Sequence, residues 1–319
     1  MRIFLSILIL QWMLELVSPF LNQQQYHKTG VKIIGGRKAR YKEFPFAVVF
    51  IRRSNSQSVC MGSVVTVLKV LSAAHCFQQL KEGKMVKVDL KIIWAVAGSR
   101  YTHRLEYGYQ KRAIISQEPH PEFQWLDYTI INDIAIAHLD SPFPISELIK
   151  PLTVYSSDPT VFKRKWDSLR KLHTLCYGIG FGSTTATGNS TYIITSSYLK
   201  VSLVLLLTYK DCSKIYPKLV EEFKKEKTYC AVSIHSNEGM CVGDSGSPLY
   251  CDGHIYAIFT KSDGCGEHSK PALYLSLESY ITMYGLSGQT SVILNGSFHS
   301  TLLCLLEITR LLYIFEQLY

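Results

Sequence analysis

A serine, a histidine and an aspartate lie in local sequences that suit nucleophilic catalysis. Ser245 lies in Gly-Asp-Ser-Gly-Ser-Pro, His75 in Leu-Ser-Ala-Ala-His-Cys, and Asp133 opens an apolar segment. A serine hydroxyl is a poor nucleophile at neutral pH, so it needs a base, a group that orients the base, and donors for the oxyanion. His75 and Asp133 are candidates for the first two. The backbone N–H of Gly243 is a candidate donor, because glycine has no Cβ to keep a carbonyl away.

Each of these residues also has an ordinary structural interpretation. A histidine before a cysteine is more often structural, an aspartate before an apolar strand is usually a turn or cap residue, and Gly-Asp-Ser-Gly occurs in ordinary turns. Along the chain, however, His75, Asp133 and Ser245 follow the order of the chymotrypsin triad, which differs from the orders in subtilisin and the α/β-hydrolases. The combination favours a catalytic triad.

The elements expected to carry these residues are short β-strands. Runs rich in β-branched and aromatic residues are separated by turn residues, without long amphipathic helices between them, which is typical of an all-β barrel or sandwich. The expected strands are 46–51, 63–71, 91–97, 113–116, 133–139, 174–178, 191–207, 248–251 and 254–260. A stretch with several prolines and charges at 140–170 is expected to link two halves, and a helix is expected at 275–284.

The N-terminal segments predict export from the cell. Residues 1–18 have the basic start and short apolar core of a secretory signal peptide, and the polar residues 19–32 are interpreted as a pro-segment. Nine cysteines then predict an oxidising compartment and a disulfide framework with one thiol left over. Asn189 and Asn295 begin N-glycosylation acceptor sequences, which agrees with a secreted, extracellular protein.

Composition predicts a folded protein without a nucleic-acid partner. The chain has 319 residues, of which 47% are hydrophobic, enough to bury a sizeable core. The net charge of +9 comes from scattered Lys and Arg, so we interpret it as a solvated basic surface.

The tail at 287–319 contains an apolar run interrupted by charges. A covering helix, a membrane-surface segment and an artefact of sequence translation remain alternatives for it.

Residues 33–286 resemble the trypsin/chymotrypsin family of serine proteases. The resemblance rests on five motifs, which are Ile33-Ile34-Gly35-Gly36, Ala73-Ala74-His75-Cys76, Asn132-Asp133-Ile134-Ala135, Gly180-Phe181-Gly182 and Gly243-Asp244-Ser245-Gly246. A single motif of this length is weak, but five in the family order are specific. The resemblance implies an all-β fold of two packed six-stranded antiparallel β-barrels with a short C-terminal helix. The first barrel is expected at about 33–150 and the second at about 151–286.

The resemblance also implies the chemistry. His75 would act as general base and then acid, Asp133 would hold its tautomer, and Ser245 would attack the peptide carbonyl to form an acyl-enzyme. The backbone N–H groups of Gly243 and Ser245 would form the oxyanion hole. Polypeptide substrates are expected, with protein protease inhibitors as further candidate partners. We expect a monomer that needs no cofactor and no metal, because the family's acidic calcium loop is missing near residues 98–106.

Activation by cleavage is implied as well. A trypsin-like protease would cut after Lys32, and the new ammonium group of Ile33, with an ordinary pKa of about 8, would pair with Asp244. The alternative is that Ile33–Gly36 is only an edge strand followed by a turn.

Family spacing further implies four disulfides, although the number of cysteines alone leaves many connectivities open. The implied pairs are Cys60 with Cys76, Cys176 with Cys251, Cys212 with Cys230, and Cys241 with Cys265, which leaves Cys304 alone in the tail. Each closed loop would stabilise the fold by about 3 to 4 kcal/mol in the chain-entropy model. The first pair would fasten the loop of His75, and the fourth would join two walls of the substrate pocket.

The substrate pocket departs from the trypsin-like pattern. Gly239 occupies the floor position that is Asp in trypsin-like enzymes, Met240 lies beside it, and Ala272 replaces a wall glycine. We therefore expect an apolar pocket that prefers apolar or small P1 side chains to Lys or Arg. Glu238, one residue from the floor position, is interpreted as a surface acid.

The strand expected to pair with the substrate is also altered. It reads Thr260-Lys261-Ser262 where the family usually has Ser-Trp-Gly. Thr260 keeps a hydroxyl to support Asp133, Lys261 suggests a preference for acidic groups on the substrate, and Ser262 adds a side chain at the pocket mouth. An insertion at 124–128 is expected to lie above the cleft. The altered cleft leaves one alternative to the protease, namely a protease-like binding protein with little or no activity.

Overall fold

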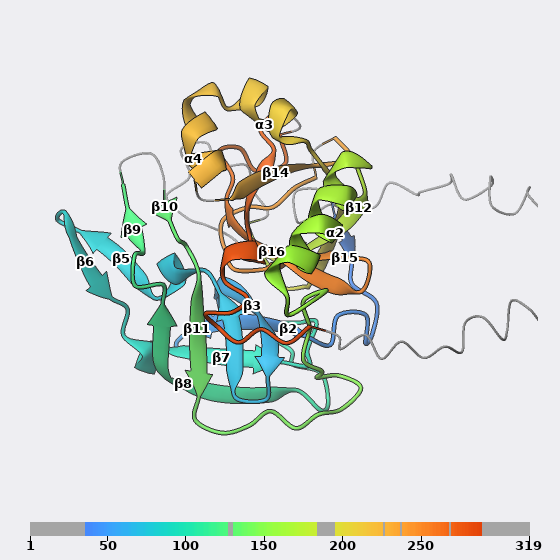
Figure 1. The fold of residues 1–319 in the computed structure, drawn as a ribbon. Helices are drawn as coiled ribbons and strands as arrows, with labels where there is room; N and C mark the ends of the chain where they lie inside the picture. The colour runs from blue at the N-terminus through green and yellow to red at the C-terminus, as the bar shows by residue number, and fades with distance from the viewer. Residues whose placement is uncertain are drawn as a thin grey trace, which may run out of the picture.

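Two closed β-barrels lie against each other (Figure 1). The structure is a computed structural model that describes residues 36–126, 130–183, 195–225, 227–236, 238–267 and 269–288. Each barrel has six antiparallel strands, so the predicted all-β fold is confirmed. The predictions for Lys32, Ile33, Asn189, Asn295 and Cys304 fall outside the described residues.

The first barrel closes in the order β11-β4-β3-β2-β7-β8. Its strands are β2 (Ala47–Arg52), β3 (Ser58–Thr66), β4 (Lys69–Ser72), β7 (Ile93–Ala97), β8 (Gln110–Pro119) and β11 (Ala135–Leu139). The predicted strand at 63–71 is wrong, because the chain reverses after β3 and forms a hairpin. The Leu68 N–H donates to the Thr66 hydroxyl over 3.3 Å in this turn. Both halves of the segment are apolar, so the sequence pattern does not reveal the reversal.

The second barrel closes through pairing of β13 with β14. Its strands are β12 (Leu175–Gly180), β13 (Lys200–Leu206), β14 (Thr228–Ser233), β15 (Pro248–Cys251), β16 (His254–Lys261) and β17 (Ala272–Ser276). A two-residue strand, β1 (Arg37–Lys38), pairs with β13. The start of the described chain is therefore attached to the second barrel.

A helix that the sequence analysis missed, α2 (Pro159–Lys171), covers part of the second barrel. The Asp158 carboxylate caps it by accepting from Thr160 N and Val161 N. Phe162, Trp166 and Leu169 are buried, and Trp166 stacks on Tyr256 at a centroid distance of 5.6 Å. The stretch at 140–170 that was expected to link the two halves therefore contains a packed element.

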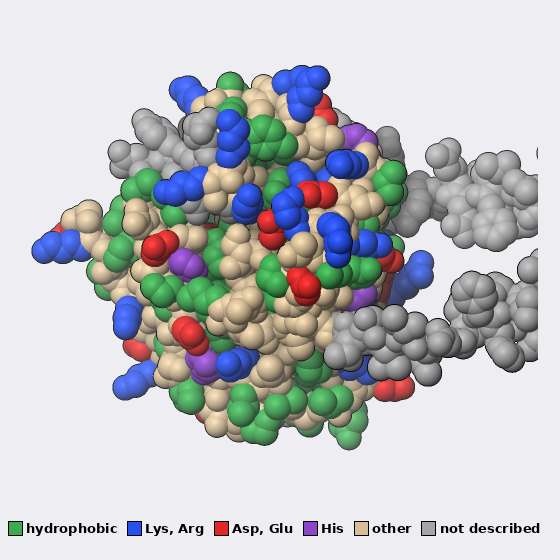
Figure 2. Space-filling model, viewed as in Figure 1, with side chains coloured by type: hydrophobic (Ala, Val, Ile, Leu, Met, Phe, Trp, Pro, Cys, Tyr) green, Lys and Arg blue, Asp and Glu red, His purple; other side chains and the backbone are tan. Residues whose placement is uncertain are grey.

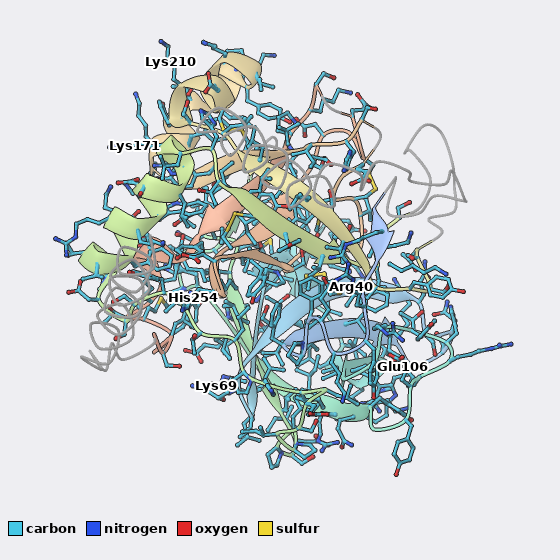
Figure 3. The ribbon with its side chains drawn as sticks, turned by 90° about the vertical axis from the view of Figure 1, so that its right-hand side faces the viewer. Arg40, Lys69, Glu106, Lys171, Lys210 and His254 are labelled. Carbon is cyan, nitrogen blue, oxygen red and sulfur yellow. A yellow bond between two sulfur atoms is a disulfide. The ribbon has the colours of Figure 1, made fainter. Side chains whose placement is uncertain are left out.

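The remaining helices are short. They are α3 (Tyr209–Ile215), α4 (Val220–Lys225) and the 3-10 turns η1 (Ala74–Cys76), η2 (Leu90–Ile92), η3 (Pro217–Leu219) and η4 (Leu277–Ser279). The predicted helix at 275–284 is reduced to η4 and following turns, because β17 extends to Ser276. Figure 3 labels Lys171 at the end of α2 and Lys210 in α3, and in Figure 2 Lys and Arg side chains gather over these helices. Within the described ranges, no helix is long and apolar enough to cross a bilayer.

Two hairpins project from the first barrel near His75. One pairs β5 (Gln78–Lys81) with β6 (Lys84–Lys87), and the other pairs β9 (Gln124–Trp125) with β10 (Ile130–Ile131). Figure 1 shows both hairpins on the same side of the molecule.

The barrels meet at the Ser245 loop. Met61 N on β3 donates to the Ser245 carbonyl over 2.8 Å. Gly246 has a φ of 83°, and a Cβ there would lie 2.2 Å from Ser72 Oγ and 2.4 Å from the Met61 carbonyl. A side chain at this position would therefore push the loop away from the first barrel.

Candidate active site

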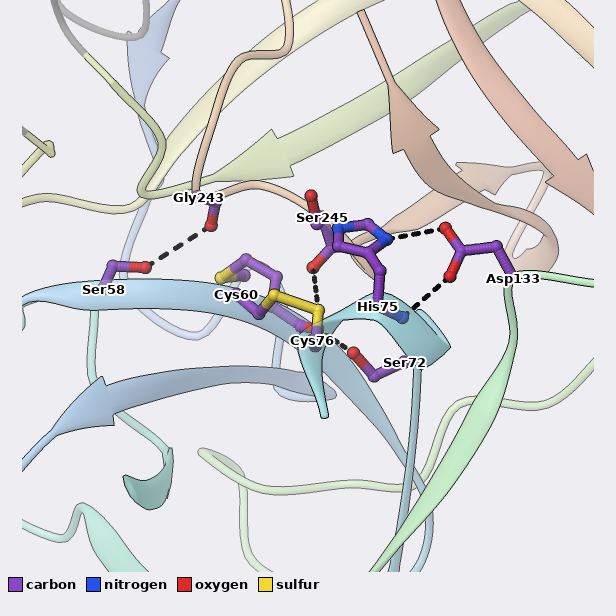
Figure 4. Close-up of a disulfide and its surroundings, with 9 residues drawn as sticks. Ser58, Cys60, Ser72, His75, Cys76, Asp133, Gly243 and Ser245 are labelled. Carbon is purple, nitrogen blue, oxygen red and sulfur yellow. Dashed lines mark hydrogen bonds and ion pairs between the residues drawn. A yellow bond between two sulfur atoms is a disulfide. The ribbon is translucent and has the colours of Figure 1, made fainter. Parts of the chain in front are cut away.

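The first barrel positions a histidine and an aspartate as a hydrogen-bonded pair (Figure 4). His75 lies in η1, directly after β4, and Asp133 lies just before β11, which pairs with β4. Nδ1 of His75 is 2.7 Å from Oδ2 of Asp133, and the backbone N–H of His75 donates to Oδ1 over 2.9 Å. The Asp133 side chain is only 1% exposed. The carboxylate therefore fixes both the ring and the backbone of His75.

The pKa of His75 is raised above its ordinary value of 6.5. Burial of the ring lowers this pKa, but the charge of Asp133 and its hydrogen bond raise it by more. Both effects of Asp133 favour the imidazolium form. The pair is thus arranged to stabilise the ion that forms when the ring accepts a proton.

The C-terminal segment holds Asp133 in place. The Tyr280 hydroxyl donates to Asn132 Oδ1 over 2.8 Å, and the Tyr284 hydroxyl donates to the Ile134 carbonyl over 3.3 Å. Asn132 itself has a φ of 49°, in the left-handed region that asparagine tolerates better than most residues. The sequence analysis missed both tyrosines, because no local pattern links residues that lie about 150 positions apart in the chain.

Ser245 and His75 line the same cavity, so the loop of the second barrel brings the serine to the pair on the first. Within the described residues, the Ser245 hydroxyl has no hydrogen bond to the His75 ring. Catalytic hydrogen bonds are often long before substrate binds. The backbone N–H groups of Gly243 and Ser245 likewise have no acceptor in the described part of the chain. These two donors are thus available to an oxyanion.

Asp244 is a buried acid beside the serine. Its Oδ1 accepts from Gly182 N over 2.5 Å and its Oδ2 from Cys241 N over 3.0 Å. Burial raises its pKa to about 7, even though both backbone donors lower it. A Cβ at Gly180 would lie 1.7 Å from this carboxylate, and one at Gly182 would lie 2.2 Å from it. The two glycines of the Gly-Phe-Gly motif therefore make room for Asp244.

A buried lysine connects the start of the described chain to this region. Lys200 Nζ donates to the Gly36 carbonyl over 3.0 Å. In the register of β12 and β13, Lys200 lies opposite Gly180, the residue that contacts Asp244. The sequence analysis did not single out Lys200, since a lone lysine in an apolar strand gives no indication of its partner.

Four of the six predicted pocket residues surround one small cavity. Gly239, Met240, Ser262 and Ala272 line a space of about 10 Å³, and Thr260 and Lys261 are not part of its lining. This volume is close to the minimum that holds one water molecule. The pocket is nearly closed in this structure.

Two expectations for this region are wrong. Thr260 does not support Asp133, because its hydroxyl donates to the Leu273 carbonyl over 3.3 Å at an irregularity in the pairing of β16 with β17. Glu238 is not a surface acid. It is half-buried, lines the pocket with Gly239, and accepts from the Ser233 hydroxyl over 3.4 Å. Burial raises the pKa of Glu238.

Lys261, for which a preference for acidic substrates was suggested, forms an ion pair with Asp263 at 3.1 Å. The structure describes residues 124–126 of the insertion at 124–128, and these reach His75. Trp125 on β9 packs edge-on against the His75 ring, with centroids 6.0 Å apart. The structure therefore adds an aromatic neighbour of His75 that the sequence analysis did not name individually.

Four disulfides fasten the loops around the site. They are Cys60–Cys76, Cys176–Cys251, Cys212–Cys230 and Cys241–Cys265, the pairs implied by the resemblance. Cys60–Cys76 joins β3 to η1 and so ties down the turn that carries His75. The loop at 98–106 is the one considered above for calcium. Its acid Glu106 forms an ion pair with Arg100 at 2.6 Å.

The arrangement of a serine loop, a histidine and a buried aspartate between two barrels matches a known family. The family model described as Trypsin matches residues 33–283. The chain belongs to the trypsin family. It is a serine endopeptidase, and its substrates are polypeptides.

Named relatives agree with this assignment. Kallikrein 1-related peptidase b3 of Mus musculus is 28% identical over 259 residues, which covers 78% of this chain and 87% of the relative. Trypsin-2 of Salmo salar is 25% identical, with 76% of this chain and 89% of the relative covered. A solved structure of mouse neuropsin, described as a serine protease expressed in the limbic system, has a TM-score of 0.61 at 22% identity. It covers 78% of this chain and 97% of neuropsin, and at this identity it supports the fold alone.

Proposed function

We propose that this trypsin-family endopeptidase works through His75, Asp133 and Ser245 and is secreted as an inactive precursor. The observation that carries the proposal is that one buried carboxylate accepts hydrogen bonds from both the ring and the backbone of His75, beside Ser245. Ser245 attacks the peptide carbonyl while His75 takes its proton, and His75 then protonates the leaving amine. Gly243 and Ser245 donate to the oxyanion.

Cleavage after Lys32 activates the precursor in this proposal. The new ammonium of Ile33 pairs with the Asp244 carboxylate and orders the Ser245 loop. Two contacts support this activation step. Lys200 donates a hydrogen bond to Gly36, and Gly180, which lies opposite Lys200 in the sheet, contacts Asp244. Three residues, Ile33 to Gly35, precede Gly36, and when extended they span up to roughly 10 Å, which sets how far from Gly36 the new ammonium group can reach. The predicted signal peptide and the glycosylation sequences at Asn189 and Asn295 support an extracellular location.

The proposed preference is for apolar or small P1 side chains. The pocket has Gly239 at its floor and is nearly closed, which favours small side chains. Two carboxyl side chains line it. Glu238 has a raised pKa and is hydrogen-bonded to Ser233, so it is a weaker anion than an exposed carboxylate. Glu267 is ion-paired with Lys270 at 2.8 Å.

Fluorophosphonate labelling tests the catalytic proposal. The purified precursor is cleaved after Lys32 and exposed to a fluorophosphonate, with Ser245→Ala as the matched control. We expect labelling that rises after cleavage and disappears in the control. Absence of labelling before and after cleavage would leave a protease-like binding protein as the better description.

A panel of peptides that differ only in P1 tests the pocket. We expect higher kcat/KM for Ala, Val and Met than for Lys, and little change in this order for Glu238→Gln. A preference for Lys that is lost in Glu238→Gln would instead make Glu238 the specificity residue and overturn the apolar assignment.

A further inference from the structure

A large cavity opens on the disulfide side of Ser245. It holds about 290 Å³ and is lined by His75, Ser245 and the disulfide Cys60–Cys76, which Figure 4 shows together. The pocket around Gly239 holds only about 10 Å³. The room for a substrate side chain is therefore much greater on the disulfide side.

The cavity lies on the side of the site where the leaving half of the substrate would bind. During Ser-His-Asp catalysis the acyl half remains on the serine, and the other half departs as an amine that the histidine protonates. The Gly239 pocket, to which the acyl half is assigned, shares no lining residue with the cavity. The cavity instead includes His75 and the η1 turn. It is placed to contact the residues that follow the scissile bond.

Aliphatic side chains form part of the wall, beside polar side chains that include two glutamines and a threonine. Val59 and Val88 are half-buried, Ile93 is buried, and Ile92 is 45% exposed. A ligand that covers Ile92 removes apolar area from water, which is favourable. The walls therefore suit an aliphatic side chain.

Arg52 contributes the permanent positive charge of the cavity. It is exposed at the end of β2 and forms no ion pair with any residue that the structure describes. The adjacent Arg53 is occupied, since its guanidinium carbon lies 3.5 Å from the centroid of the Trp94 ring. No acidic side chain from the described chain lines the cavity. A carboxylate on a bound peptide would supply the anion that Arg52 lacks.

We infer that this cavity selects the leaving half of the substrate, with an aliphatic residue directly after the scissile bond and Asp or Glu within the next two residues. The inference rests on the proposed function, because it names the substrate class of the same site. The acid pairs with Arg52 at an exposed position, so the selection weakens as salt screens the charges.

An acyl-transfer experiment measures the selectivity for the leaving half of the substrate separately from the selectivity for the acyl half. The cleaved enzyme is acylated on Ser245 with an alanine thioester, and peptide amides then compete with water for the acyl group. The amine forms a new C–N bond, the ester C–O bond to Ser245 breaks, and the amine proton returns through His75 to the serine oxygen. The nucleophiles are Leu-Glu-Ala-amide, Leu-Gln-Ala-amide, Leu-Lys-Ala-amide and Gly-Glu-Ala-amide, and a second series carries the acid at the third position.

We expect Leu-Glu-Ala-amide, or its third-position counterpart, to capture about three to five times more acyl group than the glutamine peptide, and more than the lysine and glycine peptides. Arg52→Glu should reverse the preference between glutamate and lysine. Arg104→Glu removes an equally exposed arginine that does not line the cavity, and it should leave the preference unchanged.

Equal capture of the glutamate, glutamine and lysine peptides in both series, or an unchanged preference in Arg52→Glu, would overturn the inference. Failure of the cleaved enzyme to accept any acyl group is a different result, because it contradicts the proposed function itself. A normal acyl-enzyme with unselective capture contradicts only the inference.

Discussion

At the scale of single residues, Asp133 controls the pKa of His75, which is the base in the proposed mechanism. Its carboxylate accepts from the ring and the backbone of His75 and raises the pKa of the ring. A base with a raised pKa stays protonated to higher pH, and the protonated ring cannot accept the serine proton. Acid inactivation should therefore have its midpoint above pH 6.5.

Asp133→Asn tests this role. The substitution removes the negative charge but leaves the burial that lowers the pKa of His75, so the midpoint should move to lower pH. We also expect kcat to fall by about 10⁴, because the wrong tautomer is favoured. The measurement is the pH profile of kcat/KM for both proteins, normalised by active-site titration. A midpoint that stays in place would show that Asp133 does not control the ring.

Asp244 should make the uncleaved precursor less stable as pH rises. Its pKa is about 7 in the folded chain, against an ordinary value of 3.8. Between these values the folded chain keeps a proton that the unfolded chain has lost, so the free energy of unfolding falls with rising pH. The whole effect is on the order of 4 kcal/mol.

Urea unfolding of the precursor and Asp244→Asn between pH 5 and 6.5 measures this effect. The raised pKa of His75 also contributes to stability, but this contribution is lost only as pH rises through that pKa, above 6.5. The range from pH 5 to 6.5 therefore isolates Asp244. We expect the parent to lose stability relative to the variant across the range. Parallel curves would contradict the raised pKa of Asp244.

At the scale of elements, α2 shows what the sequence reveals and what it conceals. Asp158 followed by Pro159 is a typical helix start, and Phe162, Trp166 and Leu169 follow at helical spacing. These signals were available but were outweighed by the prolines around them. In contrast, the contact of Tyr280 with Asn132 and the burial of Glu238 depend on the closed barrels, so no local pattern predicts them.

The motifs with a fixed local geometry were the predictable part of the site. His75 follows a strand and precedes a disulfide cysteine. Ser245 lies in a turn between Gly243, which has a φ of 96°, and Gly246, whose Cβ would collide with the first barrel. The error at Thr260 has a different origin. An irregularity in the pairing of β16 redirects its hydroxyl to Leu273, and the sequence of a strand does not show such irregularities.

Packing through Trp166 should account for most of the stability that α2 adds. Its ring is fully buried and stacks on Tyr256. Trp166→Ala should lower the free energy of unfolding by about 3 to 5 kcal/mol. The matched control is Leu172→Ala at the end of the same helix, where the side chain is 74% exposed and a change within about 0.5 kcal/mol is expected. Equal losses in chemical denaturation would refute this account of α2.

At the scale of the whole molecule, the proposed mechanism depends on the contact between the two barrels. His75 and Asp133 come from the first barrel and Ser245 from the second, and Gly246 allows the loops to meet. In Gly246→Ala the new Cβ collides with Ser72 and Met61, so we expect kcat/KM to fall by at least about 10².

Gly253→Ala is the matched control for this prediction. Gly253 has nearly the same backbone angle, with a φ of 81° against 83°, but its Cβ would meet open space. Both variants carry the same backbone strain of about 1 kcal/mol, and only the first carries the collision. Activity measurements and thermal unfolding of the two proteins separate these effects. Comparable losses of activity would assign the effect to backbone strain instead.

The hydrogen bond from Tyr280 to Asn132 also affects when activity can arise during synthesis. The ribosome makes the first barrel long before residue 280, and N-terminal parts generally fold first. Asp133 then lacks the clamp supplied by Tyr280 and Tyr284 until nearly all of the body has emerged. A chain that terminates early would therefore carry an unsupported aspartate, in addition to any pro-segment still attached. Such a truncated chain would have a weakened triad in the proposed mechanism.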